Sequence, residues 1–326
     1  PNANDGGFAG TILGNPLGTT VYGGKRVADN VRPGGRLFIQ YWFSDDHRWG
    51  LDGSGFFLGN AEDGRYSIAA AGNTLNIGRP FFSTDQNLTG SASEVVAARG
   101  INGGINISRQ SNLWGADLNL RRNMWCGDLF TCDLLIGGRI LGLDESLDIA
   151  ETPGPFILND RFATQNRFYG GQIGLDSELR LGNFILGMRG KLALGSTEQF
   201  VQINGNTTFN GVTIVNPATG QTGGLLAQGG TNIGNYRRHM FGVIPEVGVT
   251  LGYDIFDWWR ITAGYNFLYW NSVARPGEQI NTNVNRNFAA NAPANVAGTG
   301  PRDPSFIFKS SDIYVHGVTF GMEFRY

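Results

Sequence analysis

The last sixteen residues, SDIYVHGVTFGMEFRY at positions 311–326, decide the fold. From Val318 onward, the even positions are valine, phenylalanine, methionine, phenylalanine and tyrosine. The odd positions from Gly317 onward are glycine, threonine, glycine, glutamate and arginine. This period of two predicts a β-strand with one apolar face and one small or charged face. Repeated along a chain that ends on the aromatic Tyr326, the pattern predicts a transmembrane β-barrel.

Eight segments upstream are predicted as strands on the same pattern, although residues 49–59 are glycine-rich and alternate less clearly. They span residues 35–44, 49–59, 103–122, 133–145, 167–180, 184–201, 241–253 and 259–271. Pro245 predicts a bulge or irregular pairing in one of them, because proline removes a donor from the ladder. With nine strands the first and the last run in the same direction, whereas a closed bacterial barrel has an even number. We therefore expect about ten to twelve strands, with a further strand before Pro1 or hidden in residues 1–34 or 60–101.

Short and long connections alternate along the chain, which is typical of outer-membrane barrels with short periplasmic turns and long external loops. Short turns are expected near residues 45, 127, 182 and 255, and external loops near 60–101, 146–166, 204–235 and 275–310. Residues 1–34 are rich in glycine and asparagine and predict an irregular N-terminal arm. The predicted fold is thus all-β: one domain over residues 1–326, an antiparallel transmembrane β-barrel.

Composition agrees with this class. Hydrophobic residues make up 41% of the 326 residues and charged residues only 16%, with 50 glycines. The net charge of −2 predicts no nucleic-acid partner, and no run approaches the ~18 apolar residues of a membrane helix. We expect a location in the bacterial outer membrane, with outer-membrane lipid and the barrel-insertion machinery as partners. An exported barrel needs a signal peptide, so the chain starting at Pro1 is expected to be processed or incomplete.

Aromatic residues gather at the short turns. Trp42, Trp49, Trp125, Trp258 and Trp259 lie at or beside them, and Tyr326 ends the chain. Tryptophan and tyrosine are enriched at membrane interfaces, so these residues predict a girdle at the inner interface. The alternative is that the tryptophans cap the core of a soluble sandwich.

The inward faces of the predicted strands carry nearly balanced charge. The predicted lumen network comprises Arg36, Asp117, Arg121, Arg139, Glu145, Asp176, Arg189, Lys191, Glu246, Arg260, Glu323 and Arg325, with Asp52, Glu178 and Arg180 as further inward charges. Small barrels are filled by their own side chains, and charges buried there must be paired. We therefore expect a largely filled lumen, and the alternative is a charged pore lining.

Cys126 and Cys132 flank Gly-Asp-Leu-Phe-Thr in a predicted hairpin connection. In an oxidising periplasm this pair is a candidate disulfide. Two free thiols are the alternative.

Catalytic and metal sites have little support. His47, His239 and His316 show no metal-ligand spacing, and no EF-hand-like spacing predicts calcium. His316 with a serine would be needed for an outer-membrane hydrolase, but no residue is marked as a nucleophile. We expect no enzyme activity, cofactor or metal.

Several segments together resemble a planctomycete outer-membrane beta-barrel family known as beta-barrel protein seven. They are GGRL (34–37), YWF (41–43), RPFF (79–82), LWGADLNLR (113–121), residues 134–147, FYGGQ (168–172), GNY (234–236), IPEVG (244–248), GYNFLY (264–269) and RPG (275–277). The resemblance covers most of the chain in order. It implies an outer-membrane barrel with an aromatic-rich strand before Pro1, and it brings no catalytic motif.

Two functions from different classes follow from these observations. The first is a structural or surface-interaction protein with a filled, charge-paired lumen and long external loops that contact other surface proteins or copies of itself. The second is a narrow, porin-like passive pore for small solutes. An outer-membrane hydrolase is a weaker third.

Overall fold

The computed structural model describes residues 31–59, 66–70, 76–86 and 88–325. Most of the predicted N-terminal arm, and Tyr326 with its predicted interface position, lie outside the described residues. Among those described, no helix is long and apolar enough to cross a membrane.

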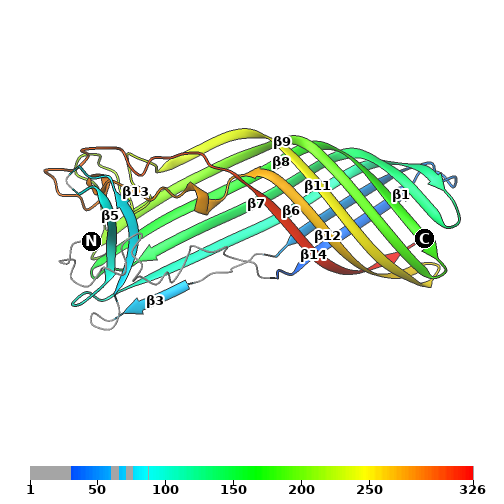
Figure 1. Ribbon diagram of the computed structural model, residues 1–326, viewed down its shortest axis with the longest axis horizontal. Coiled ribbons are helices and arrows are strands. Elements are labelled where there is room, and N and C mark those ends of the chain that lie inside the picture. Colours follow the sequence, from blue (N-terminus) through cyan, green and yellow to red (C-terminus); the bar gives the residue numbers. More distant parts are fainter. Residues whose placement is uncertain (1–30, 60–65, 71–75, 87, 326) are drawn as a thin grey trace.

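One curled antiparallel sheet dominates the fold (Figure 1). Its strands, in spatial order, are β1 (Gly34–Trp42), β2 (Trp49–Leu58), β6 (Gly103–Cys126), β7 (Phe130–Glu151), β8 (Phe156–Leu181), β9 (Phe184–Phe209), β11 (Gly234–Phe256), β12 (Trp259–Val273) and β14 (Ser311–Phe324). We call these nine the wall. Two short strands extend it, because β3 (Tyr66–Ala70) pairs with β6 and β10 (Val212–Ile214) pairs with β9. All nine predicted strands are present, and each wall strand is antiparallel to its neighbours.

The two ends of the wall, β1 and β14, run in the same direction, as predicted, and no register between described residues joins them. Within residues 60–101 one strand, β3, belongs to this sheet, which has 11 strands and so falls in the predicted range of about ten to twelve, but β3 does not join β1 to β14. There β3 pairs with β6, while β4 (Ile77–Ser83) and β5 (Gly90–Ala97) form a separate sheet with β13 (Asn283–Val284). The other place expected for it, residues 1–34, lies almost wholly outside the described residues.

The wall is much taller on one side than on the other. We call the end with the short turns the turn end and the opposite end the loop end. Strand β8 has 26 residues and β9 also 26, whereas β1 has nine and β2 ten. A membrane-crossing strand needs only ~9–11 residues. The long strands β6, β7, β8, β9 and β11 therefore continue well beyond an apolar layer of membrane thickness.

The predicted external loop at 146–166 is wrong. Strand β7 continues to Glu151 and β8 starts at Phe156, so only residues 152–155 form the turn. The outward side chains here are mostly small or polar and include the charged pair Asp148 and Arg161, 2.9 Å apart. The sequence predicts strands from an apolar outer face, and these strand segments do not have one. The predicted loop at 204–235 is shortened for the same reason, since β9 runs to Phe209 and β11 starts at Gly234.

The loop end is occupied by segments that fold inward, which we call the plug: β4, β5, residues 215–233 and residues 275–310, including the short 3-10 helices η2 (Pro276–Gln279) and η3 (Arg286–Phe288). Figure 1 shows β5 and β13 beside the loop-end tips of the long strands. A buried core joins plug and wall, and it contains Phe81, Phe162, Val201, Ile203, Leu225, Leu226, Ala227, Ala274 and Val284. These long and mostly polar segments therefore form a folded cover, which buried hydrophobic side chains attach to the wall.

Pro245 marks an irregular pairing, as predicted. Its register with β9 is continuous, opposite Leu192, but pairing of β11 with β12 begins only at Glu246. Beyond this point the side chain of Asn271 replaces a backbone partner: it accepts a hydrogen bond from the backbone N–H of Val243 at 2.6 Å. Strand β12 therefore separates from β11 here and turns toward the inside of the wall.

Candidate functional site

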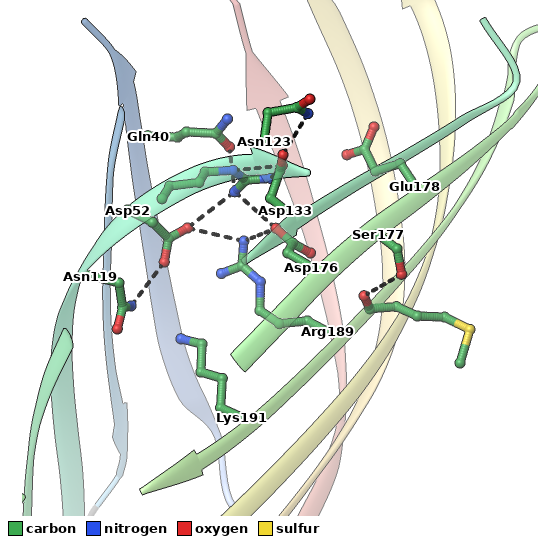
Figure 2. A network of polar contacts seen from close by, with 12 residues as sticks. Gln40, Asp52, Asn119, Asn123, Asp133, Asp176, Ser177, Glu178, Arg189 and Lys191 are labelled. Atoms are coloured by element: carbon green, nitrogen blue, oxygen red, sulfur yellow. Dashed lines mark hydrogen bonds and ion pairs between the residues drawn. The ribbon is translucent and has the colours of Figure 1, made fainter. Parts of the chain in front are cut away.

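A network of charged side chains crosses the lumen near the turn end (Figure 2). Arg121 on β6 contacts Asp52 at 3.4 Å and Asp176 at 2.9 Å. Its Nε donates to Asp133 Oδ2 at 2.8 Å. Arg189 on β9 contacts two of the same carboxylates, Asp52 at 3.1 Å and Asp176 at 2.6 Å. The two guanidinium groups thus join carboxylates from β2, β7 and β8 into one cluster.

The network continues toward the loop end. Lys191 Nζ lies 2.8 Å from Asp117 Oδ1. Glu246 on β11 receives two arginines, with Arg36 of β1 at 2.7 Å and Arg139 of β7 on its other oxygen. The contact between β1 and β11 crosses the lumen, because these strands are far apart in the wall order.

Charge is balanced within these layers. The cations are Arg36, Arg121, Arg139, Arg189 and Lys191, and the anions are Asp52, Asp117, Asp133, Asp176 and Glu246. None of the ten side chains is more than 22% exposed. A buried charge without a partner costs several kcal/mol, so the equal numbers let this many charges occupy the lumen.

A second charged cluster lies at the turn end. Arg260 Nε donates to Asp254 Oδ1 at 2.7 Å, and its Nη1 lies 3.2 Å from Glu323. Arg325 Nε donates to Glu323 at 2.8 Å. Glu178 of β8 also contacts Arg260, at 3.2 Å. This cluster joins the closing strand β14 to β8, β11 and β12.

The structure brings every residue of the predicted lumen network into an ion pair, although not into one cluster. Glu145 lies apart from the others and pairs with Arg109 and Arg275, each at 2.9 Å. Sequence reasoning missed Asp133, which has the inward parity of Arg139 on β7 and could have been found from it. It also missed Arg275, because nothing in a polar loop marks a side chain that turns into the barrel.

An apolar layer lies directly beyond the ionic network on the loop-end side. Its buried side chains are Leu113, Leu141, Leu143, Phe168, Ala193, Ile244, Leu268, Trp270 and Val273, and Phe56, Leu58, Ile313 and Val315 pack against them. They come from eight wall strands. Phe168 and Trp270 are fully buried and meet edge to face, with ring centroids 6.4 Å apart.

Local features let this layer pack across the lumen. A Cβ added to Gly242 would lie 2.7 Å from the Phe168 ring, so the glycine makes room for it. Trp270 Nε1 donates to Thr197 Oγ1 at 3.1 Å, which satisfies the one polar atom of the indole. After Trp270 the chain turns inward through Ser272, whose φ is 52°. The sequence predicted Trp270 neither as a core residue nor as a lumen residue.

Polar contacts fasten the plug to the wall. Arg275 donates to both oxygens of Glu145 at 2.9 Å. Asn166 on β8 exchanges two hydrogen bonds with the backbone of Ala274, at 2.8 and 2.9 Å. These contacts attach the chain that leaves β12 to the opposite side of the wall.

Asp160 of β8 is a second point of attachment. Its Oδ2 accepts from Arg79 of β4 at 2.7 Å. Its Oδ1 accepts from the backbone N–H groups of Leu226 and Ala227 at 3.0 and 2.8 Å. One buried carboxylate therefore holds two separate plug segments.

The outer face of the wall carries an apolar belt. Exposed side chains in it include Leu118, Ile136, Ile140, Tyr169, Ile173, Leu175, Met188, Leu192, Leu194, Val247, Val249, Leu251, Val318, Phe320 and Met322. Toward the loop end the outward residues become charged, as in Arg167, which lies 2.7 Å from Asp144. Each of the nine wall strands carries exposed apolar side chains, and a soluble protein rarely exposes so much apolar surface.

The predicted interface tryptophans fall into two groups. Trp49, Trp125 and Trp258 are exposed near the turns, and Trp258 stacks with Phe324 at 6.3 Å between ring centroids. Trp42 instead faces inward, where Arg121 lies over its ring at 5.4 Å. Trp259 is half-buried. The predicted place of Trp42 in the girdle is wrong, because it has the inward parity of Gln40 on β1.

The predicted disulfide is also wrong, since Cys126 and Cys132 are free thiols. In the pairing of β6 with β7, Cys126 lies opposite Thr131 and Cys132 lies opposite Trp125. Paired residues share a face and successive residues alternate. The two sulfur atoms therefore lie on opposite faces of the sheet, and spacing alone could not show this.

The histidines lie apart from one another. His47 is in a turn with a φ of 49° and lies beside Trp42, while His239 and His316 face outward on β11 and β14. In the part of the chain that the structure describes, no group of three or more His, Cys, Asp or Glu side chains could hold a metal ion.

Comparison with known proteins gives one family. Residues 2–326 match the family described as "Putative beta barrel porin-7 (BBP7)". No curated protein matches. Four chains of solved structures match, among them the outer membrane protease OmpT from Escherichia coli. That likeness has 12% identity and a TM-score of 0.45, and covers 85% of this chain and 79% of the other.

Proposed function

Since the chain belongs to the beta barrel porin-7 family and is a β-barrel protein of the bacterial outer membrane, we propose that it is a closed barrel with a structural and surface-interaction role. Its turn end faces the periplasm and its loop end faces the cell exterior, following the usual asymmetry of such barrels. The apolar belt contacts outer-membrane lipid.

The apolar layer carries this proposal. Phe168 and Trp270 are both fully buried, and the side chains around them come from opposite sides of the wall. Hydrated ions and sugars cross a membrane protein through polar, water-filled space, as in porin lumens. A packed apolar layer across the lumen leaves them no such path.

The ionic network supports the same reading. An open pore lined with charge leaves side chains in water, whereas here the five cations and five carboxylates neutralise one another across the lumen. Lys191 and Arg139 are almost fully buried. We propose that the network fixes the relative positions of the wall strands and has no role in selecting ions.

The exterior surface is the proposed working part. The plug presents a folded cover at the cell surface, with a cleft of about 610 Å³ between Glu94 and Val95 of β5, the turn 153–155, and Asn291. Ligand clefts are commonly of this size. We propose contacts of this surface with other surface proteins or with copies of the same chain.

Liposome swelling tests the closed lumen. Purified protein is reconstituted into liposomes and diluted into isotonic arabinose, with an open general porin as the positive control. We expect no swelling beyond that of protein-free liposomes. Swelling whose rate falls with solute size would overturn the closed lumen and favour the narrow pore that the family name suggests.

The proposal includes no catalysis. His316 lies on the outer face with its ring 5.9 Å from that of Tyr265. A phospholipase assay on the protein and on His316→Ala is the check, and activity lost in the variant would contradict this part of the proposal.

A further inference from the structure

A buried carboxylate at the contact between plug and wall lacks hydrogen-bond donors. Glu151 is the last residue of β7 and is fully buried. Neither of its carboxylate oxygens has a hydrogen-bond partner among the described residues. Its closest cation is Arg79 of β4, with Nη1 3.2 Å from Oε1 and without hydrogen-bond geometry. An ionised carboxylate in such a place is expensive.

The charge of Arg79 is already shared with a better-placed partner. Asp160 accepts from Arg79 Nη2 at 2.7 Å and from two backbone N–H groups of the plug. Hydrogen bonds from charged and backbone donors stabilise the ionised form. Of the two carboxylates beside Arg79, Asp160 is therefore the one that holds the negative charge.

The wider surroundings leave one negative charge in excess. Glu94 of β5 also acts on Glu151 and pairs with Arg286 of η3 at 3.3 Å. Two guanidinium groups thus face three carboxylates, Glu94, Glu151 and Asp160. Since no metal-holding group occurs among the described residues, a proton is the remaining way to balance the cluster.

We propose that Glu151 binds a proton that holds the plug against the wall, so that loss of this proton loosens the plug. The protonated side chain adds no charge to the cluster and lets β4 and residues 225–227 dock on β7 and β8. The ionised side chain places an unsolvated negative charge beside Glu94 and Asp160. This proton latch, as we call it, deepens the proposed function by assigning control of the cover on the closed lumen.

The raised pKa of Glu151 determines how docking of the plug depends on pH. Burial, then the charges of Asp160 and Glu94, raise the pKa of Glu151 from its ordinary 4.5 to about 7, although Arg79 opposes the rise. A raised pKa means that docking is favoured most below 4.5 and weakens as pH rises through about 7. Each pKa unit is tenfold in the docking equilibrium, so complete ionisation weakens docking by about 300-fold.

Hydrogen–deuterium exchange on the whole folded protein in detergent tests the proton latch. Protection factors, corrected for the chemical exchange rate, are measured from pH 5 to pH 8 for peptides covering β4 and residues 225–227. In the unmodified protein we expect protection to fall by roughly a hundredfold over this range. A peptide from the belt segment of β8 serves as the internal control and should change little.

Two variants make the assignment specific. Glu151→Gln mimics the protonated form, so its plug should stay protected at pH 8. Glu94→Gln keeps Glu151 but removes a neighbouring negative charge that raises its pKa. The fall in protection should therefore be smaller and level off at a lower pH than in the unmodified protein, because the ionised form becomes less unfavourable to dock. Heat-modifiable mobility on a gel confirms that each barrel has folded.

Either of two results would overturn the proton latch. One is pH-independent protection of the plug in the unmodified protein, which needs no variant to fold. The other is the same pH dependence in Glu151→Gln as in the unmodified protein. Because exchange is measured without any solute flux, failure here is distinguishable from failure of the closed lumen, which liposome swelling reports.

Discussion

The ionic network and the apolar layer occupy neighbouring levels of the same lumen and fill it by opposite means. In the ionic network every side chain depends on a particular partner, as Glu246 depends on Arg36 and Arg139. In the apolar layer Phe168 and Trp270 depend only on close packing with whatever lies beside them. The network therefore specifies which strands face each other, while the layer excludes water.

This difference predicts that the two levels fail differently. Removing one member of a buried ion pair leaves an uncompensated charge and destabilises the fold. Removing a packed ring leaves a cavity, and only this cavity lies where water is otherwise excluded. Variants in the ionic network should therefore lose stability without conducting, whereas variants in the apolar layer should also gain conductance.

The largest effect is expected from the double variant Phe168→Ala with Trp270→Ala. Each truncation alone costs about 3–5 kcal/mol of the free energy of unfolding, and the pair costs more than either, with non-additivity because the rings touch. Urea unfolding in detergent measures the loss. In planar bilayers the variant should show current steps that the unmodified protein lacks.

The single variant Phe168→Ala is the control in case the double variant does not fold. It should show smaller and briefer current steps. If neither variant conducts although both are folded, the apolar layer is not what closes the lumen.

A smaller effect is expected from Glu246→Ala, which removes the carboxylate shared by Arg36 and Arg139. Breaking a buried pair costs about 3–5 kcal/mol. Thr250→Ala on the same inward face of β11 is the matched control and should cost less than about 1 kcal/mol. Conductance should stay absent, because the apolar layer is intact. Currents as large as those of the double variant would show that the two levels act as one.

The smallest effect is expected from Asp148→Ala, outside the lumen. Its partner Arg161 is 52% exposed, so water screens the pair. Exposed pairs contribute about 0–1 kcal/mol, and thermal or urea midpoints should hardly move. A loss comparable to that of Glu246→Ala would contradict the view that burial decides the strength of these pairs.

The wall could be predicted from the sequence because contact with lipid requires apolar side chains at every second position of each strand. Val318, Phe320 and Met322 show that rule in β14, and the alternation gave the inward parity of Glu323 as well. Parity also placed the lumen charges on the correct face. It could not say which would pair, because partners such as Arg36 and Glu246 meet across the barrel and not along a strand.

The loop end could not be predicted in the same way, because strands that extend beyond the lipid need no apolar outer face. Strand β7 continues to Glu151 with charged residues on its outer face, so it resembled a loop. Arg79, Asp160 and Arg275 are ordinary polar-loop residues in sequence, and only folding of the plug into the wall gives them buried partners. The free state of Cys126 and Cys132 depended on the strand register, which spacing does not reveal.

The contact between Arg36 and Glu246 has a consequence for assembly. These residues are 210 positions apart in the chain, and contacts between distant positions form slowly. Until the sheet curls, the inward charges of early strands lack their late partners and would face lipid at high cost. Membrane entry and curling must therefore proceed together. A chain that stops short of β11 lacks Glu246, the carboxylate that pairs with both Arg36 and Arg139. These ion pairs can therefore form only after the chain has been made as far as β11.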